Sequence, residues 1–175
     1  MISDRLDKTI RTIPNFPKDG INFKDITPLL MNADLSSVII DTFAIQLEGL
    51  KLDAIVGIES RGFLFGFLLA NKMGIPFIPI RKAGKLPGET LKYKYDLEYG
   101  SAEVEVHKFD VNKGWNVLVH DDLLATGGTA CAAAELIQRL GAKVAGFAFV
   151  VALDSLDGKE RLKQYSENII SLKDY

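Results

Sequence analysis

The amino-acid sequence predicts an α/β fold in which a mainly parallel, twisted sheet is flanked by helices. Short apolar runs alternate with helix-length segments, which is the pattern of repeated βαβ units. The composition agrees, because 175 residues that are 47% apolar and 25% charged are typical of a globular domain. A chain of this length can bury a core without a metal or a disulfide, so we expect one domain over residues 1–175.

The first part of the chain is predicted to hold two helices around one loop. Apolar side chains recur at helical spacing over residues 2–13, behind the capping residue Asp4, and indicate a short N-terminal helix. Residues 14–30 are rich in Pro, Gly, Asn and Asp, which predicts a loop with local turns. A second helix follows Asp34, and Gly49 sits where that helix would end.

The alternating elements of the sheet follow. Strands that are buried on both faces appear as short, nearly unbroken apolar runs, and four such runs occur between the helical segments. The predicted elements are strands at residues 54–58, 77–80, 117–119 and 144–153 and helices at residues 62–73 and 128–140. Ligands of such sheets bind outside the carboxyl ends of the strands, so the functional residues are expected there.

One segment departs from the alternation. Residues 82–100 are polar, turn-rich and too long for a routine connector, which predicts a lid or a binding loop. Residues 101–108 alternate apolar and polar side chains, with Glu105 on the polar side. This pattern predicts a half-exposed strand that closes a hairpin behind the loop.

Charge and hydropathy exclude several classes of partner. With 21 basic and 23 acidic residues the formal charge is −2, which gives no general attraction to a nucleic acid. The most apolar stretches, residues 63–70 and 144–153, are far shorter than the ~20 residues that span a bilayer. The charged N-terminal residues lack the apolar core of a secretory signal. We therefore expect no nucleic-acid or membrane partner and a cytoplasmic location, which also suits one free cysteine.

The motif with the clearest chemistry is the thirteen-residue string VLVHDDLLATGGT at residues 117–129. Residues 125–129 can bend so that several backbone amides point at one spot, and the helix that follows adds its positive end. Such a cradle suits one phosphate monoester. Asp121 and Asp122 precede it and can accept hydrogen bonds from sugar hydroxyls or help to hold hydrated Mg2+. The alternative is that these acids merely cap the helix. The string is neither a Walker loop nor a dinucleotide fingerprint.

This string resembles the signature of the phosphoribosyltransferase family, which grips the 5-phosphate and ribose of phosphoribosyl pyrophosphate. Further segments resemble the members of that family that use adenine, in the right order and spacing. These segments are residues 23–30, 59–63, 81–82 with 84–88, and 96–100. The resemblance implies the type I phosphoribosyltransferase fold with a long catalytic loop. It also implies purine salvage, in which phosphoribosyl pyrophosphate and adenine give AMP and pyrophosphate with Mg2+ as cofactor, in a homodimer.

The resemblance also assigns roles to individual residues. Glu98 is expected to handle the purine proton, and Arg61 and Lys82 to stabilise the charge that grows on the departing pyrophosphate. Phe23 is expected to stack on the purine. The expected substrate-binding residues are Phe23, Lys24, Arg61, Arg81, Lys82, Lys85, Tyr99, Asp121, Asp122, Ala125, Thr126, Gly127, Gly128 and Thr129. Mg2+ is expected to be held mainly through the substrate, with Asp121 and Asp122 as candidate ligands. The peptide between Glu59 and Ser60 is expected to be cis.

Alternatives remain open at this point. A phosphoribosyltransferase for guanine, hypoxanthine or xanthine is disfavoured by Phe23 and by residues 96–100. A non-catalytic regulator that binds phosphoribosyl pyrophosphate and controls nucleic acids would need a DNA-binding domain or a basic face. His120 is interpreted as a hydrogen-bonded interior histidine rather than a catalytic one. Cys131 is interpreted as a small packing residue, against the alternative of a thiol activated by the helix start.

Overall fold

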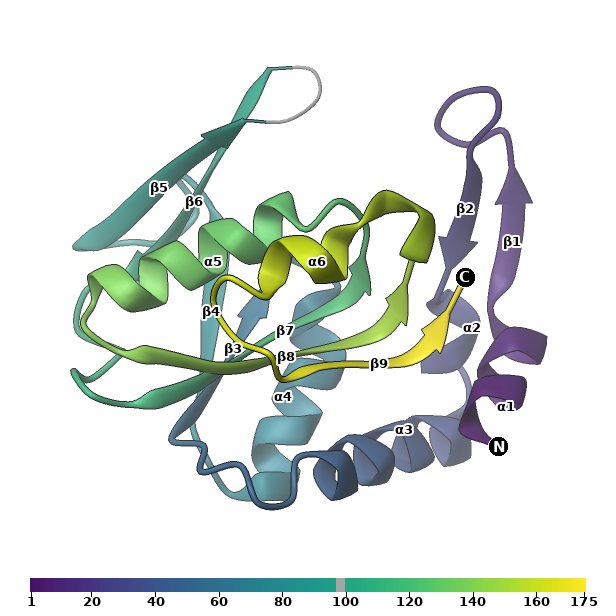
Figure 1. Cartoon of the computed structure of the whole chain (residues 1–175), viewed down its shortest axis with the longest axis horizontal. Coiled ribbons are helices and arrows are strands. Elements are labelled where there is room, and N and C mark those ends of the chain that lie inside the picture. The colour runs from purple at the N-terminus through teal and green to yellow at the C-terminus, as the bar shows by residue number, and fades with distance from the viewer. Residues whose placement is uncertain (97–99) are drawn as a thin grey trace.

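A central sheet organises the part of the chain that the structure, a computed structural model, describes: residues 1–96 and 100–175. Its seven strands lie in the order β5-β6-β4-β3-β7-β8-β9 (Figure 1). The strands are β3 (Ala54–Ile58), β4 (Phe77–Lys82), β5 (Thr90–Asp96), β6 (Ser101–His107), β7 (Asn116–Leu124), β8 (Lys143–Ala152) and β9 (Ile169–Asp174). Strands β4, β3, β7, β8 and β9 are parallel, while the pairs β4–β6 and β5–β6 are antiparallel. The predicted mainly parallel α/β fold is confirmed.

Helices cover both faces of the sheet, and each face has its own apolar core. On one side α1 (Ile2–Thr9), α3 (Ala33–Gln46) and α4 (Gly62–Met73) pack against a core that includes Ile55 and Leu118. On the other side α5 (Gly128–Arg139) and α6 (Gly158–Leu162) pack against a core that includes Val56 and Val119. Successive residues of a strand point to opposite faces, which is why neighbouring residues serve different cores. This double burial explains why these strands appear in the sequence as unbroken apolar runs.

The N-terminal region differs from the prediction. The helix α1 ends at Thr9, and residues 14–30, which were expected to be a loop, contain regular elements. Strand β1 (Arg11–Pro14) pairs antiparallel with β2 (Asn22–Asp25), and α2 (Thr27–Leu30) follows. A two-stranded ribbon with four residues in each strand is stable only through its contacts with the rest of the molecule. The local sequence therefore carries little sign of it.

The segment at residues 82–100 is also more regular than expected. Strand β5 occupies Thr90–Asp96 and pairs with β6 from Thr90 opposite His107 to Asp96 opposite Ser101. The predicted hairpin is therefore confirmed, but the loop is shorter than residues 82–100. The half-exposed pattern predicted for β6 is wrong at Glu105, which is 1% exposed. Strand β9 has no counterpart in the sequence-based prediction.

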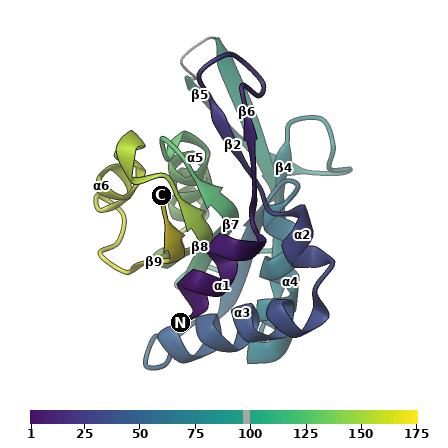
Figure 2. The same ribbon diagram turned by 90° about the vertical axis from the view of Figure 1, so that its right-hand side faces the viewer.

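Strand β7 extends beyond its predicted end at residue 119. Its pairing with β8 continues from Asp121 opposite Phe149 to Leu124 opposite Ala152. The two acids therefore lie within the strand rather than after it, because the long neighbour β8 continues the ladder past them. The β1–β2 ribbon and the β5–β6 hairpin project at the same end of the molecule (Figures 1 and 2).

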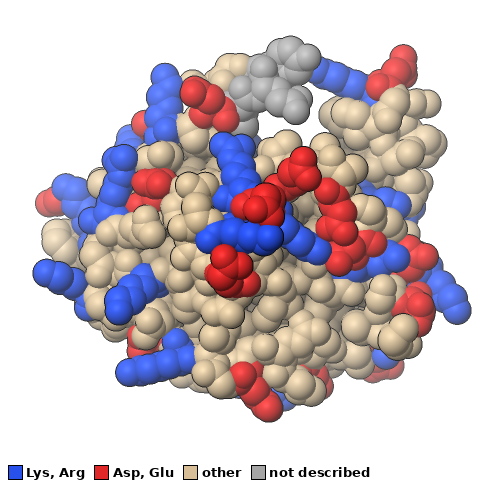
Figure 3. All heavy atoms as spheres, viewed as in Figure 1, with Lys and Arg blue, Asp and Glu red and all other residues tan. Residues whose placement is uncertain are grey.

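Two surveys of the described residues bear on partners. None of the helices they form has the length and apolarity needed to cross a bilayer. On the face seen in Figure 3, acidic and basic side chains are interspersed, and no broad basic surface of the kind that binds nucleic acids is visible there.

Candidate active site

The turn between β7 and α5 forms the cradle that the sequence predicts. Residues 123–130, with Asp121 and Phe149, line a cavity of about 90 Å³ at this turn. Gly127 has φ +81°, a conformation that favours glycine, and its carbonyl accepts a hydrogen bond from the Cys131 amide at 2.8 Å. The first amides of a helix have no partner within the helix and form the positive end of its dipole. The cradle is thus a small, backbone-lined cavity whose chemistry suits an anion.

The start of α6 supports the cradle from outside the motif. A Cβ added to Gly158 would lie 2.2 Å from the Ala125 carbonyl oxygen, and one added to Gly127 would lie 3.2 Å from the Gly158 carbonyl oxygen. Both glycines therefore permit a backbone contact that a side chain would block. Tyr95, in β5, approaches from another side, with its hydroxyl 3.1 Å from Thr129 Oγ1. The cradle is thus fixed by three segments that are distant in the sequence.

A second cavity, of about 390 Å³, lies beside the cradle and is rich in charge. It is lined by Glu59, Ser60, Arg61, Lys82, Lys85, Asp121, Asp122 and Leu123. These residues come from the ends of β3, β4 and β7, since the carboxyl ends of parallel strands meet at one edge of a sheet. Asp121 lines both cavities, so the two cavities adjoin. The structure brings Arg61, Lys82, Lys85 and both acids together, as the sequence predicts.

The acidic pair is buried and linked to Arg61. The Arg61 Nε lies 3.0 Å from Asp122 Oδ2, and the Asp122 side chain is 4% exposed. Asp121 Oδ1 accepts a hydrogen bond from the Asp122 amide at 2.8 Å. Burial and the neighbouring Asp122 charge raise the pKa of Asp121 well above its usual value. Burial also raises the pKa of Asp122, and the Arg61 charge opposes that rise.

Glu59 gathers the cations of this cavity. Its side chain is 7% exposed and accepts hydrogen bonds from Arg81 Nε at 3.2 Å, from the Lys82 amide at 3.0 Å and from Lys85 Nζ. Burial alone would raise the pKa of Glu59, but these three donors hold it at about 2. Arg81 also donates to the Lys85 carbonyl at 3.3 Å and does not line the cavity. Its guanidinium orients neighbouring residues in this structure.

The third and largest cavity, of about 1070 Å³, opens from the cradle toward the N-terminal ribbon. Lys24 from β2, Thr126 and Thr129 from the cradle, and Arg161 from α6 are among its lining residues. Lys24 Nζ donates to Thr12 Oγ1 at 3.0 Å and lies 3.7 Å from the centre of the Tyr175 ring. This cavity is large enough for a ligand that continues beyond a phosphate.

Phe23 belongs to β2 of this ribbon, and its ring contacts Arg61 of the charged cavity. Its half-buried ring meets Phe16 edge-on, with the ring centres 5.2 Å apart, and the Arg61 guanidinium carbon lies 5.4 Å from its centre. Phe23 is not among the residues that line the three cavities. Its contact with Arg61 nevertheless connects it to the acidic pair.

Oxygen ligands suitable for Mg2+ are present in the charged cavity. Asp122 Oδ2 is buried, and its contact with Arg61 is an ion pair rather than an aligned hydrogen bond. Within the described residues no group of three or more His, Cys, Asp and Glu side chains could hold a metal by itself. Mg2+ is commonly bound through one or two carboxylates together with substrate phosphates, and this arrangement fits the two acids found here.

Two further predictions concern buried groups. His120 is fully buried against Phe43, with the ring centres 5.6 Å apart, so its predicted interior position is confirmed. The predicted hydrogen bond is not found, because neither ring nitrogen has a partner at hydrogen-bond geometry among the described residues. Burial lowers the pKa of His120 to about 4, and a backbone contact with Ala148 opposes part of this shift. Cys131 is buried, and burial raises its pKa, which favours packing over an activated thiol. The peptide between Glu59 and Ser60 is cis, as expected.

Some site residues lie outside the described part of the chain or outside the prediction. Glu98 and Tyr99 fall within residues 97–99, which the structure does not describe. The sequence analysis missed Tyr95, Glu105 and Arg161, and gave Glu59 no role. The one available signal was the position of Glu59 directly after a buried strand.

Comparisons with known proteins agree with this geometry. The phosphoribosyl transferase domain model matches residues 29–174, and the chain belongs to the phosphoribosyltransferase family. Among its relatives, the adenine phosphoribosyltransferase of Caldanaerobacter subterraneus subsp. tengcongensis is 51% identical over 172 residues, which are 98% of each chain.

Solved structures place the chain among the adenine-specific members. The crystal structure of adenine phosphoribosyltransferase from Thermoanaerobacter pseudethanolicus is 48% identical, covers 100% of both chains and has a TM-score of 0.95. The yeast adenine phosphoribosyltransferase, from Saccharomyces cerevisiae, is 43% identical, covers 98% of both chains and has a TM-score of 0.92. That structure holds adenine and an imino-altritol bisphosphate. Within its family, the chain therefore groups with the adenine phosphoribosyltransferases.

Proposed function

We propose that this chain transfers the 5-phosphoribosyl group of phosphoribosyl pyrophosphate to adenine, which gives AMP and pyrophosphate in purine salvage. The observation that carries the proposal is the pair of adjoining anion sites that share Asp121. Phosphoribosyl pyrophosphate has a phosphate at one end of the ribose and a pyrophosphate at the other. The cradle suits the first, the charged cavity suits the second, and the acidic pair lies between them, where the ribose hydroxyls would be.

The reaction requires stabilisation of the departing pyrophosphate. Negative charge grows on this group as the bond to the ribose breaks, and preorganised cations are the usual means of stabilising such charge. Arg61 and Lys82 are assigned this role, with Lys85 beside them in the same cavity. Bound Mg2+ would add positive charge on the phosphate oxygens, and Asp121 and Asp122 are the residues that would hold it. Arg81 acts through Glu59 and Lys85, with which it is hydrogen-bonded.

The purine site is assigned to the side of the largest cavity that β2 forms. Lys24 lines this cavity, and its neighbour Phe23 lies next to Arg61, which lines the charged cavity. The phenyl ring offers a face on which a purine can stack. The yeast relative binds adenine together with a bisphosphate, which is the combination that this site would accept.

Glu98 is proposed as the residue that handles the purine proton. Proton transfer by a positioned carboxylate contributes roughly 10²- to 10⁴-fold to a rate, so Glu98→Gln should lower turnover within that range. The exposed acid Glu89, which pairs with Lys108 on the surface, provides the control variant Glu89→Gln. Rapid-quench measurement of the chemical step checks this assignment, and unchanged turnover of Glu98→Gln would remove Glu98 from the mechanism. Tyr99 is proposed to line the closed site.

The test of the proposed activity is a panel of bases. The purified protein with Mg2+ and phosphoribosyl pyrophosphate is mixed separately with adenine, hypoxanthine, guanine and xanthine, and nucleotides are separated by chromatography. AMP from adenine alone is the expected result. Product from another base alone would overturn the assignment of adenine, and no product from any base would overturn the assignment of a transferase.

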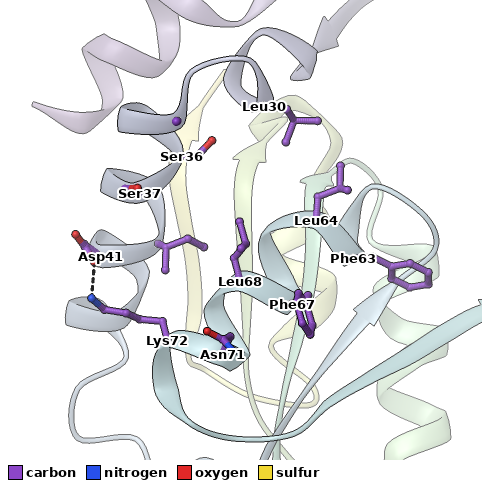
Figure 4. Close-up of a pocket in the computed structure, with 12 residues that line it drawn as sticks. Leu30, Ser36, Ser37, Asp41, Phe63, Leu64, Phe67, Leu68, Asn71 and Lys72 are labelled. Atoms are coloured by element: carbon purple, nitrogen blue, oxygen red, sulfur yellow. Dashed lines mark ion pairs between the residues drawn. The ribbon is translucent and has the colours of Figure 1, made fainter.

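The proposal includes a homodimer. Helices α2, α3 and α4 border a groove of about 850 Å³ whose exposed apolar side chains include Leu30, Leu64, Phe67 and Leu68 (Figure 4). Phe67 is 57% exposed, and contiguous apolar surface of this kind is typical of interfaces. The groove lies along α4, which begins directly after Arg61, so a second copy seated there would rest close to the active site.

Light scattering after size exclusion tests the dimer. Phe67→Glu places a charge in the groove and should yield monomers, whereas Phe109→Glu should not, since Phe109 is exposed elsewhere on the surface. A wild-type monomer would contradict the proposal. The proposed location is the cytoplasm, supported by the unpaired Cys131, and cell fractionation tests it.

A further inference from the structure

Glu105 is a buried carboxylate that the proposed reaction does not use. It lies on β6, is 1% exposed and is absent from the lining of the site cavities. A buried charge is costly unless hydrogen bonds and ion pairs compensate for the loss of water. The partners of Glu105 therefore indicate what this burial achieves.

These partners lie in the segment that leads from β4 into β5 and in the first residues of β5. Glu105 Oε1 accepts hydrogen bonds from the backbone amides of Lys85 at 2.8 Å and Leu86 at 2.9 Å. Glu105 Oε2 accepts one from Thr90 Oγ1 at 3.0 Å and lies 3.9 Å from Lys92 Nζ. Burial raises the pKa of Glu105, yet these donors hold it below its usual value, so the group is an anion that binds this segment.

Lys85 is thereby fixed at both ends. Its backbone amide donates to Glu105, and its ammonium group donates to Glu59 in the charged cavity. Glu59 also holds the Lys82 amide at 3.0 Å. The two carboxylates form a chain of contacts from β6 to the cations that line the proposed pyrophosphate site.

We propose that Glu105 is a positioning residue for the pyrophosphate side of the active site. It holds the backbone of residues 85–90 so that Lys85 and Lys82 face the cavity before substrate arrives. This inference rests on the proposed function, because it assigns pyrophosphate to that cavity. The side chain acts through Lys85 and touches no reacting atom.

The backbone ladders of the sheet do not use this carboxylate. Strand β6 is held by its backbone pairing with β4 and β5, while Glu105 adds side-chain contacts to the connecting segment and to Thr90 and Lys92 at the start of β5. The phosphate cradle shares none of these contacts. Loss of the carboxylate should therefore weaken pyrophosphate binding and spare AMP binding.

Two variants and one control test the proposal by calorimetry with Mg2+. Glu105→Ala removes every acceptor, and we expect the Kd of pyrophosphate to rise roughly 10- to 100-fold while the Kd of AMP changes by less than about twofold. Glu105→Gln keeps an oxygen for the two backbone amides and should fall between Glu105→Ala and wild type. Glu103→Gln, two residues earlier on β6, should match wild type. In steady state, the KM of phosphoribosyl pyrophosphate should rise and that of adenine should not.

Two results would overturn the inference. One is unchanged pyrophosphate affinity in folded Glu105→Gln and Glu105→Ala. The other is equal weakening of AMP and pyrophosphate, which would indicate a merely structural role. Where Glu105→Ala does not fold, Glu105→Gln alone decides. Failure of the proposed function is recognised separately, because wild-type protein would then make no AMP while its pyrophosphate affinity could still be compared with that of the variants.

Discussion

The two proposed anion sites of this molecule, the cradle and the charged cavity, are built in different ways. The cradle is made of consecutive residues at one turn, and its donors are backbone amides at the start of α5. The charged cavity is made of side chains from three separate segments, and most of its cations already have an acidic partner. Arg61 pairs with Asp122, and Lys85 pairs with Glu59. The cradle depends on the course of the backbone, whereas the cavity depends on a balance of charges.

This difference determines how each site can fail. A backbone site is lost when the turn cannot adopt its conformation, so small steric changes should damage it. A site of paired charges is damaged when one partner is removed and the other is left buried without compensation. Variants of each kind should therefore separate the binding of AMP from the binding of pyrophosphate.

The largest effect is expected for Arg61→Ala. This change removes a cation from the cavity and leaves Asp122, 4% exposed, without its partner. Breaking such a pair costs the folded state about 3 to 5 kcal/mol in general. Loss of the cation itself should lower kcat/KM for phosphoribosyl pyrophosphate roughly 10²- to 10³-fold, as loss of one preorganised stabilising group typically does. Steady-state kinetics provide the measurement. The double variant Arg61→Ala/Asp122→Asn should regain stability in urea but not activity, and recovery of activity would contradict the role of Arg61.

A smaller effect is expected for Gly127→Ala in the cradle. The added Cβ would sit at φ +81° and 3.2 Å from the Gly158 carbonyl oxygen. A left-handed conformation alone costs roughly 1 to 2 kcal/mol for other residues, so AMP affinity should fall about 10- to 100-fold once the crowding is added. Calorimetry with AMP measures this.

Gly74→Ala is the matched control for that variant. Gly74 has φ +67° with open space around its Cβ position, and it lies at the far end of α4. The Gly74→Ala protein should lose stability and keep the AMP affinity of wild type. Equal loss of AMP affinity in both variants would show that the cradle contact with Gly158 is unimportant.

The smallest effect is a dependence of stability on pH. The pKa of Glu59 is about 2 in the folded protein, below the usual value of 4.5. A depressed pKa means that the stabilisation is fully present above pH 4.5 and is lost as the pH falls toward 2. Urea unfolding between pH 6 and pH 3 should therefore show that the difference in free energy of unfolding between wild type and Glu59→Gln shrinks as the pH falls. A difference in favour of wild type that grows toward low pH would contradict the ion pairs assigned to Glu59.

The contrast between the two sites also explains what the sequence could predict. The cradle follows from consecutive residues, so residues 117–129 identified it directly, although the acids turned out to lie inside β7. Arg61 was found through the family resemblance of residues 59–63, which follow a buried strand. Glu105 was missed because an alternating strand pattern normally places such a residue in water, and the segment that covers it is remote in sequence. The short β1–β2 ribbon and β9 depend on tertiary contacts and leave little local pattern.

The central claim is that two independent anion sites, one of backbone and one of paired charges, together bind phosphoribosyl pyrophosphate. Calorimetric titration of AMP and of pyrophosphate with Mg2+ into wild type, Gly127→Ala and Arg61→Ala tests it most directly. The account predicts that Gly127→Ala loses AMP affinity and retains pyrophosphate affinity, while Arg61→Ala shows the reverse preference. Loss of both ligands by equal factors in either folded variant would contradict it.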